Sequence, residues 1–330
     1  MGVSVDRRKF VAGALGAGVA LAAPAVRGQA SAWPNKPVRV TVTFPAGGLT
    51  DVFARTYSEY ASQKLGQPFV VENKTGASGA IGAEQMSKAA PDGYNLMFTI
   101  STTMVMNKVL FKKLPYDPDK DFVPVAFFSA GHLPFIVHKD VPAKNLKEFV
   151  EFARKNKVSI GSYGAGTYSH VVVAELNKFY GLSMEAVHYR GEAPMWQDVA
   201  AGAVHAGSGS YAAAGGVLQS GSGRAIAVPQ TTRMRKLPDV GTFLEQGCTA
   251  QGFQLRGWIG AFYQTGTPRE IVEKMSALFV ECGKTERLQK MLDTFGIDEA
   301  AQDHNVMRKV IDEEGPVWLE LVRSLNITPQ

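Results

Sequence analysis

The sequence has few of the residues that build metal-centred or cross-linked structure. Its 330 residues include only two cysteines, Cys248 and Cys282, and six histidines. Neither set shows the spacing of a metal site, so we expect no metal. An oxidising compartment permits a bridge between the two thiols, but their spacing leaves open whether a disulfide forms.

A strong excess of charge and a long apolar run are also absent. The formal net charge is +5, but residues 1–30 contribute four basic side chains against one acidic side chain. The rest of the chain therefore carries a net charge of about +2, which predicts no nucleic-acid or polybasic membrane surface. No later segment approaches the roughly 20 apolar residues of a membrane span. No repeat of fixed period is present, which excludes repeat architectures.

The N-terminus, residues 1–30, has the pattern of a twin-arginine export signal. Arg7 and Arg8 precede a weakly apolar stretch over residues 11–25, and small residues follow at Gly28 and Ala30. This order is typical of a signal that is removed by a peptidase, and the apolar stretch is short for the alternative, a membrane anchor. We predict cleavage near Ala30 and a mature periplasmic protein of roughly 300 residues.

The rest of the chain alternates apolar strands with helical patterns. Hydrophobic residues make up 45% of the sequence and charged residues 20%, which is typical of a soluble globular protein long enough for two lobes. Strands are expected at 38–44, 69–72 and 94–99, with a helical pattern after each of the first two. Successive units of this kind predict a parallel sheet that binds ligands at the carboxyl ends of its strands.

The same alternation returns after residue 146 and predicts a second lobe. Extended apolar segments at 122–138 and 253–262 are interpreted as the two crossings between the lobes. We therefore predict a first lobe from residues 31–132 and 255–330 and a second lobe from residues 133–254. Each lobe is expected to be an α/β unit with a mostly parallel sheet flanked by helices.

Two glycine-containing turns, one in each predicted lobe, follow a strand and precede a helix. They span residues 44–51 and 163–170. The first amides of a helix lack internal partners, the helix dipole adds partial positive charge there, and glycine lets an anion approach the backbone. We expect both turns to converge across a cleft on one carboxylate group of a ligand.

The candidate ligand-binding residues belong to these turns and to the neighbouring strand ends. In the first lobe they are Phe44, Ala46, Gly47, Gly48, Thr50, Asp51, Ser78 and Ser101. In the second lobe they are Tyr163, Ala165, Gly166, Thr167, His170, Arg190, His205 and Ser208.

The roles of several candidates stay open at this point. The hydroxyl groups of Thr50, Thr167 and Ser169 either contact the ligand or cap their own helices, and we expect capping for at least one. Asp51, near a helix start, is better explained by the helix dipole than as a base. Arg190 binds a second carboxylate or forms a surface ion pair.

Two stretches of the sequence match enzyme motifs in part and give alternatives to a binding site. Residues 76–80 loosely match the G-x-S-x-G nucleophile turn of serine hydrolases, but no triad partner stands in a recognisable turn. Residues 164–169 match part of a dinucleotide-binding turn, with Glu185 about 20 residues further on. That match supports an exported NAD(P)-dependent oxidoreductase as the alternative function, although Ser169 and the position of Glu185 inside a strand fit it poorly. We expect no catalytic residue and no cofactor.

Short motifs also follow one another along the mature chain in a specific order. They are Trp33-Pro34 with Lys36-Pro37, Phe44-Pro45-Ala46-Gly47-Gly48 with Asp51, Glu72-Asn73-Lys74 with Gly76-Ala77-Ser78-Gly79, Ile81-Gly82-Ala83-Glu84, Pro91-Asp92-Gly93-Tyr94, Gly164 with Gly166-Thr167 and His170, Tyr189-Arg190-Gly191 with Pro194, Leu237-Pro238-Asp239-Val240, and Gly266-Thr267-Pro268. Together they resemble the Bug-type (TctC-like) extracytoplasmic solute receptors of tripartite tricarboxylate transporters.

The resemblance implies a two-lobed periplasmic binding protein of the Venus-flytrap, type II-like kind, without catalysis. It implies a small organic carboxylate held between the turns of the two lobes and delivered to the membrane permease subunits of the transporter. We expect the receptor to act as a monomer, without nucleic-acid partners.

The sequence departs from the family pattern where ligand specificity is expected. After residues 201–204 relatives usually carry aspartate, whereas this chain has His205, followed by small residues at 206–210. Loss of the acid and of bulk predicts a wider ligand with a second carboxylate, so we expect a dicarboxylate, with an aromatic one such as a phthalate isomer as a candidate. An amino acid is disfavoured because its amine would need the missing acid.

Overall fold

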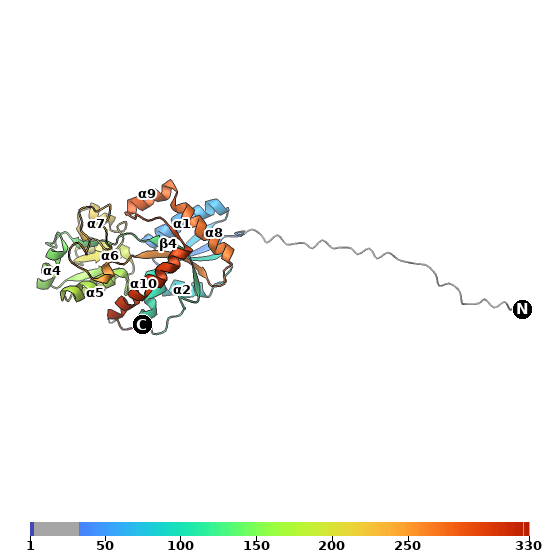
Figure 1. The fold of residues 1–330 in the computed structure, drawn as a ribbon, viewed down its shortest axis with the longest axis horizontal. Coiled ribbons are helices and arrows are strands. Elements are labelled where there is room, and N and C mark those ends of the chain that lie inside the picture. Colours follow the sequence, from blue (N-terminus) through green and yellow to red (C-terminus); the bar gives the residue numbers. More distant parts are fainter. Residues whose placement is uncertain (3–32, 326, 330) are drawn as a thin grey trace. The chain divides into compact units, whose positions relative to one another are not determined.

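The computed structural model describes residues 1–2, 33–325 and 327–329. Apart from Met1 and Gly2, the predicted export signal and its cleavage site near Ala30 lie outside the described residues. The described residues from 33 onward form one compact unit, whose helices and strands are shown in Figure 1.

The first sheet has six strands in the order β11-β4-β10-β3-β1-β2. Its strands are β1 (Val38–Val42), β2 (Phe69–Asn73), β3 (Asn95–Ile100), β4 (Phe122–Ser129), β10 (Trp258–Gln264) and β11 (Gln302–Asp303). β1 pairs in parallel with β2 and β3, and β10 runs antiparallel between β3 and β4. The parallel strands are joined by α1 (Leu49–Leu65) and α2 (Ala80–Ser87), as parallel pairing requires.

The second sheet has five strands in the order β7-β6-β8-β5-β9. They are β5 (Phe135–His138), β6 (Ser159–Ser162), β7 (Glu185–His188), β8 (Ala206–Ser208) and β9 (Gly223–Ala227). β6 pairs in parallel with β7 and β8, and β5 runs antiparallel to β8 and β9. The chain thus enters this sheet between β4 and β5 and returns to the first sheet at β10.

Helices surround both sheets, with α4 to α7 around the second and α1, α2, α8 and α9 around the first (Figure 1). The other α-helices are α3 (Asn107–Leu110), α4 (Leu146–Lys155), α5 (Tyr168–Tyr180), α6 (Glu192–Ala201), α7 (Gly215–Gln219), α8 (Arg269–Gly283), α9 (Glu286–Phe295) and α10 (His304–Ser324). α4 shows why such helices form where they do: the Asn145 side chain caps its N-terminus by accepting from Glu148, and its apolar face is buried.

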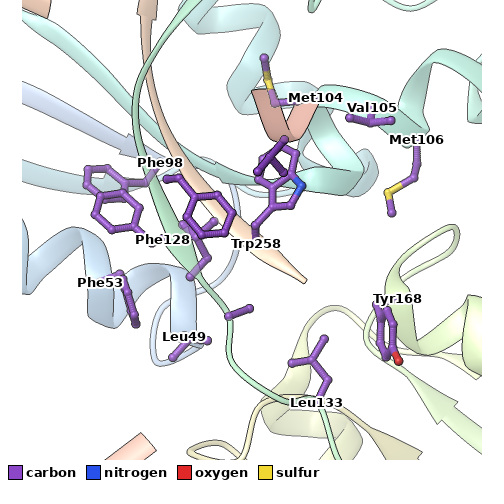
Figure 2. Close-up of a cluster of buried hydrophobic side chains, with 14 of the residues drawn as sticks. Leu49, Phe53, Phe98, Met104, Val105, Met106, Phe128, Leu133, Tyr168 and Trp258 are labelled. Atoms are coloured by element: carbon purple, nitrogen blue, oxygen red, sulfur yellow. The ribbon is translucent and has the colours of Figure 1, made fainter. Parts of the chain in front are cut away.

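Aromatic side chains form the core behind the first sheet. Phe128 on β4 stacks on Phe98 of β3 at 5.4 Å and lies 4.6 Å from Tyr57 of α1, measured between ring centroids. Phe53 of α1 joins the same cluster (Figure 2). Burying each such ring contributes roughly 1.5–3 kcal/mol, so α1 is fixed firmly against the strands whose ends border the site.

The predicted fold class is confirmed: the chain has two α/β lobes with mixed, mostly parallel sheets. One local difference lies after the third strand, where Ser101, expected at a strand end, is followed by a π-helix over Thr102–Met106. Cys248 and Cys282 are both buried free thiols, so the disulfide that the sequence left open is not formed. Among the described residues, no helix combines the length and apolar character needed to cross a membrane.

Candidate ligand-binding site

A cleft lies where the carboxyl ends of β1, β3 and β6 meet the crossings between the lobes. It has an empty volume of about 730 Å³, part of it open to solvent. Its lining residues are Phe44, Pro45, Ala46, Gly48, Leu49, Thr50, Ile100, Ser101, Ala130, Leu133, Tyr163, Tyr168, Arg190, Gly191, Glu192, Ala193, Pro194, Ser210, Gly257, Trp258 and Ile259. Leu49, Leu133, Tyr168 and Trp258 surround part of this space in Figure 2. The cleft therefore joins both lobes at the strand ends predicted to bind a ligand.

The N-terminus of α1 faces this cleft with unused backbone donors. Gly48 is the N-cap residue, and no side chain caps the helix. Within the described part of the chain, the amides of Gly48, Leu49 and Thr50 donate no hydrogen bond. Three free amides at the positive end of a 17-residue helix are suited to an anion such as a carboxylate.

Asp51 holds this turn in place from behind. Its carboxylate accepts from the Gly47 amide at 3.1 Å, from Arg55 at 3.0 Å and from Asn73 at 2.9 Å. Burial raises the pKa of the Asp51 carboxyl, but its three donors outweigh burial, so that pKa lies below its ordinary value. Neither Gly47 nor Asp51 borders the cleft, so their expected direct contact with a ligand is replaced by a role in shaping the turn.

The turn over residues 163–170 uses most of its polar groups internally. The Tyr163 amide donates to the Ser169 hydroxyl at 3.1 Å, and the Thr167 hydroxyl donates to the Gly164 carbonyl at 2.7 Å. Thr167 is the N-cap residue of α5, but its side chain does not cap the helix. Thr50 does not cap α1 either, since Gly48 occupies that position. The hydroxyl groups of Thr167 and Ser169 therefore bind the turn itself.

The side chain of Tyr163 covers the N-terminus of α5. Burial, and next the charge of Glu192, raise the pKa of Tyr163, while the backbone of Ser169 and Tyr168 and the Thr167 side chain act in the opposite direction. Those opposing contacts place the tyrosine hydroxyl at the first turn of the helix. The hydroxyl group of Tyr163 therefore lies near the positive end of α5.

His170 also turns inward. Its Nδ1 accepts from the Gly166 amide at 3.1 Å, and its ring lies 4.5 Å from that of His188. Burial and, second, His188 lower the pKa of His170 to about 4, so the imidazole is neutral near pH 7. A Cβ on Gly166 would meet Leu110 at 2.2 Å. Neither Gly166 nor His170 borders the cleft.

A second hollow continues from the cleft on the side of residues 75–79. The two share five lining residues, namely Phe44, Pro45, Tyr163, Arg190 and Gly191. Here the Ser78 hydroxyl donates to the Ala165 carbonyl at 3.2 Å, which links the two lobes directly. Ser78 and Ala165 thus meet each other, in keeping with their predicted position at the cleft.

Arg190 lines both hollows from the connection between β7 and α6. Its side chain is exposed, and among the described residues it forms no ion pair. The alternative role that the sequence left open, a surface ion pair of Arg190, is therefore not found among the described residues. Its guanidinium group remains available to a carboxylate.

Two candidates of the second lobe lie away from the cleft. His205 precedes β8 instead of ending a strand, and its ring contacts Ser159 at 3.2 Å and Phe152 of α4. Because β8 and β6 run in parallel, this is the edge of the sheet opposite the ligand side. The Ser208 hydroxyl donates to the Leu133 carbonyl at 2.9 Å and is fully buried. The expectation that His205 faces the ligand is wrong.

The small residues before Ser210 do not widen the cleft. A Cβ on Gly207 would lie 3.2 Å from Trp196, and a Cβ on Gly209 would lie 2.8 Å from the Glu192 carboxylate. The space is therefore filled by side chains of α6, which corrects the expectation of extra room for a wide ligand.

Glu192 is a cleft residue that sequence reasoning missed. Its two carboxylate oxygens accept from the Ser210 amide at 2.7 Å and the Ser210 hydroxyl at 2.6 Å. Burial raises the pKa of Glu192, and the contacts with Ser210 only partly offset it. Its place directly after Arg190-Gly191, at the start of a predicted helix near the cleft, was the signal that could have identified it.

The two enzymatic alternatives require side-chain positions that differ from those in the structure. Glu185 stands at the start of β7, the end away from the 163–170 turn, whereas a ribose-binding acid is needed near the phosphate-binding turn. The Ser78 hydroxyl is bonded to a backbone carbonyl, not to a histidine. Among the described residues, no group of three or more His, Cys, Asp or Glu side chains could hold a metal ion.

Comparison with known proteins agrees with this geometry. The family model described as tripartite tricarboxylate transporter family receptor (TctC) matches residues 53–327. Among solved structures, Rpa4515 of R. palustris with adipate has a TM-score of 0.85 at 27% identity, covering 90% of this chain and 100% of that one. The periplasmic binding protein BugD has a TM-score of 0.80 at 29% identity, with 90% and 100% covered. MatC of Rhodopseudomonas palustris with bound malate has a TM-score of 0.78 at 30% identity, with 88% and 99% covered.

Proposed function

We propose, from the premise that this chain belongs to the tripartite tricarboxylate transporter receptor family, that it captures a small organic dicarboxylate and delivers it to the membrane permease of such a transporter. Members of this family are periplasmic solute-binding receptors and not enzymes. Relatives of similar structure are described with adipate and with malate, both dicarboxylates.

The observation that carries this proposal is the open N-terminus of α1. Its free amides at Gly48, Leu49 and Thr50 face the cleft without a charged partner from the protein. Arg190 supplies a second positive group from the other lobe. Two separate anion-binding groups on the two walls of one cleft favour a ligand with two carboxylates.

The middle of the cleft favours an apolar ligand body. Aromatic and aliphatic side chains line it, among them Phe44, Leu49, Leu133, Tyr168 and Trp258. Such walls bury carbon atoms while the two ends of the ligand meet polar groups. An aliphatic chain fits this description, and an aromatic ring such as that of a phthalate isomer is the second body to test because rings stack on rings.

Capture by closure of the lobes follows from the contacts between them. Ser78 bonds to Ala165 across the cleft, and Gly191 packs against Pro45. A ligand that contacts both walls of the cleft adds to these contacts and so favours the closed form. A ligand that touches both α1 and Arg190 does so only when the lobes are close together.

We propose that residues 1–30 direct export by the twin-arginine route, with cleavage near Ala30, and that the mature receptor is a monomer. Its partner is the permease, as expected for a receptor of this family.

A thermal-shift panel on the mature protein tests the proposal. Succinate, malate, adipate and phthalate are compared with the monocarboxylates butyrate and benzoate and with NAD. A dicarboxylate present at 100 times its Kd should add about 2.7 kcal/mol to the unfolding free energy. Stabilisation by monocarboxylates alone, or by NAD alone, would contradict the proposal, and native mass spectrometry should find an organic acid and no nucleotide in the purified protein.

A further inference from the structure

Glu192 places a carboxyl group in the ligand cleft without a cation to balance it. The side chain borders the empty space of the cleft, yet protein atoms surround the rest of it. Among the described residues, no Lys, Arg or His forms an ion pair with it. A partly buried carboxylate in this situation gains from any donor that reaches it.

The geometry leaves Glu192 with unused acceptor capacity. Ser210 donates one hydrogen bond to each carboxylate oxygen, at 2.7 and 2.6 Å. Both contacts point donors at Glu192, as suits the ionised form, and each oxygen keeps a second lone pair. Glu192 is also the first residue of α6, where the helix dipole favours negative charge.

The neighbours fix the carboxyl group in one position. Ser210 holds both oxygens, and a Cβ on Gly209 would lie only 2.8 Å from one of them. Trp196 packs on the same glycine at 3.2 Å from that Cβ position. These contacts hold the carboxyl group at the cleft.

We propose that Glu192, held by Ser210, is a specificity residue that selects ligands carrying a hydrogen-bond donor, a hydroxyl or an ammonium group, beside their second carboxylate. This inference rests on the proposed function and narrows its ligand class to hydroxy- or amino-dicarboxylates. A dicarboxylate without such a donor makes no hydrogen bond with Glu192 and brings a further negative charge towards it. A ligand with a donor makes that hydrogen bond.

The acid that the sequence analysis found missing at position 205 is thus present in the cleft at position 192. The reason for disfavouring an amine on the ligand no longer holds, because Glu192 provides the negative charge that an amine needs. The hydroxyl and the ammonium group remain two sources of the same donor chemistry.

Isothermal titration with three four-carbon dicarboxylates separates these sources. Succinate carries no donor, malate carries a hydroxyl group and aspartate carries an ammonium group. We expect wild-type protein to bind malate or aspartate about tenfold or more tightly than succinate. Glu192→Gln removes the charge and should abolish a preference for aspartate, and Glu192→Met removes both acceptors and should abolish a preference for malate as well. Glu185→Gln, an exposed site on β7, is the matched control and should keep the wild-type ratios.

The outcomes are distinct. Equal or tighter binding of succinate by the wild type, or ratios that survive in a folded Glu192→Met variant, would overturn the inference while leaving the dicarboxylate receptor intact. Failure of all three acids and of adipate and phthalate to bind would overturn the proposed function and the inference with it. Thermal melts of each variant show that it is folded.

Discussion

The turns over residues 44–51 and 163–170 have the same sequence pattern but different chemistry. Each follows a strand, contains glycine and opens a helix. In the first, Asp51 binds the turn from behind and leaves the amides at the start of α1 free. In the second, the hydroxyl groups of Thr167 and Ser169 bind the turn itself, and Tyr163 covers the start of α5.

The difference teaches that a helix N-terminus binds an anion only if the protein leaves its donors unused. In both turns a side chain of the helix takes the amide before the N-cap residue, Asp51 that of Gly47 and His170 that of Gly166. Only in the second turn does a tyrosine hydroxyl group lie near the first amides of the helix. The first turn is therefore assigned the carboxylate of the ligand, and the second turn is assigned the shaping of the opposite wall.

The largest effect is expected from Gly48→Asp, which should turn the open N-terminus into a closed one. Gly48 has φ −78° and ψ 167°, an extended conformation that suits an N-cap aspartate, and a Cβ there would make only an ordinary contact at 3.6 Å. The new carboxylate should occupy the free amides, stabilise the fold by roughly 0.5 kcal/mol, and weaken dicarboxylate binding more than roughly 100-fold.

Calorimetric titration and thermal melts measure both effects, with Gly48→Ala as the control that adds a Cβ without a charge. Retained affinity in Gly48→Asp would show that the two turns do not differ in the proposed way.

A smaller loss is expected from Arg190→Ala, which removes the positive group of the second wall. A charge-assisted hydrogen bond contributes about 1.5–3 kcal/mol, so affinity for dicarboxylates should fall roughly 10- to 100-fold, while monocarboxylates should be nearly unaffected. Titration with succinate and butyrate provides the comparison, and exposed Arg308 changed to alanine is the control. Equal losses of affinity for both acids would contradict the assignment of Arg190 to the second carboxylate of the ligand.

The smallest effect concerns the stability of the second turn. The pKa of His170 is lowered from 6.5 to about 4 in the folded protein, so between these values the unfolded chain binds more protons than the folded chain. The unfolding free energy should therefore fall as pH drops through this window, by up to roughly 3 kcal/mol from His170. Between pH 7 and pH 4, the unfolding free energy of His170→Gln should fall by about 1–3 kcal/mol less than that of the wild type.

Denaturant unfolding at the two pH values measures this difference, with His205→Gln as the matched control at the far edge of the second sheet. An unchanged pH dependence in His170→Gln would mean that His170 does not hold the second turn as a neutral acceptor.

The fold was largely predictable because hydrophobic periodicity and turn residues act locally. The strands expected at 38–44, 69–72 and 94–99 were placed within a few residues, since apolar spacing and turn residues determine them. The π-helix over Thr102–Met106 was not predicted, because the hydrogen bond from the Thr103 hydroxyl to the Ser78 carbonyl exists only in the folded protein.

The candidate site was predictable only as a location. The sequence placed Gly48, Thr50, Ser101 and Arg190 at strand ends, and the structure brings all four to one cleft. It could not show which amides are already bonded, or that His205 lies at the other edge of its sheet, because both depend on tertiary register. Glu192 was overlooked for the same reason, since its partner Ser210 is distant in sequence.

The most direct test of the open N-terminus of α1 removes one amide without changing the helix. Proline is tolerated at the first helical position, and the extended Gly48 before it suits a following proline. Leu49→Pro deletes the Leu49 amide, whereas Leu49→Ala shortens the same side chain and keeps that amide. Titration should give Leu49→Pro about tenfold weaker dicarboxylate binding than Leu49→Ala at similar thermal stability. Equal affinity of the two variants would contradict the assignment of the ligand carboxylate to this helix.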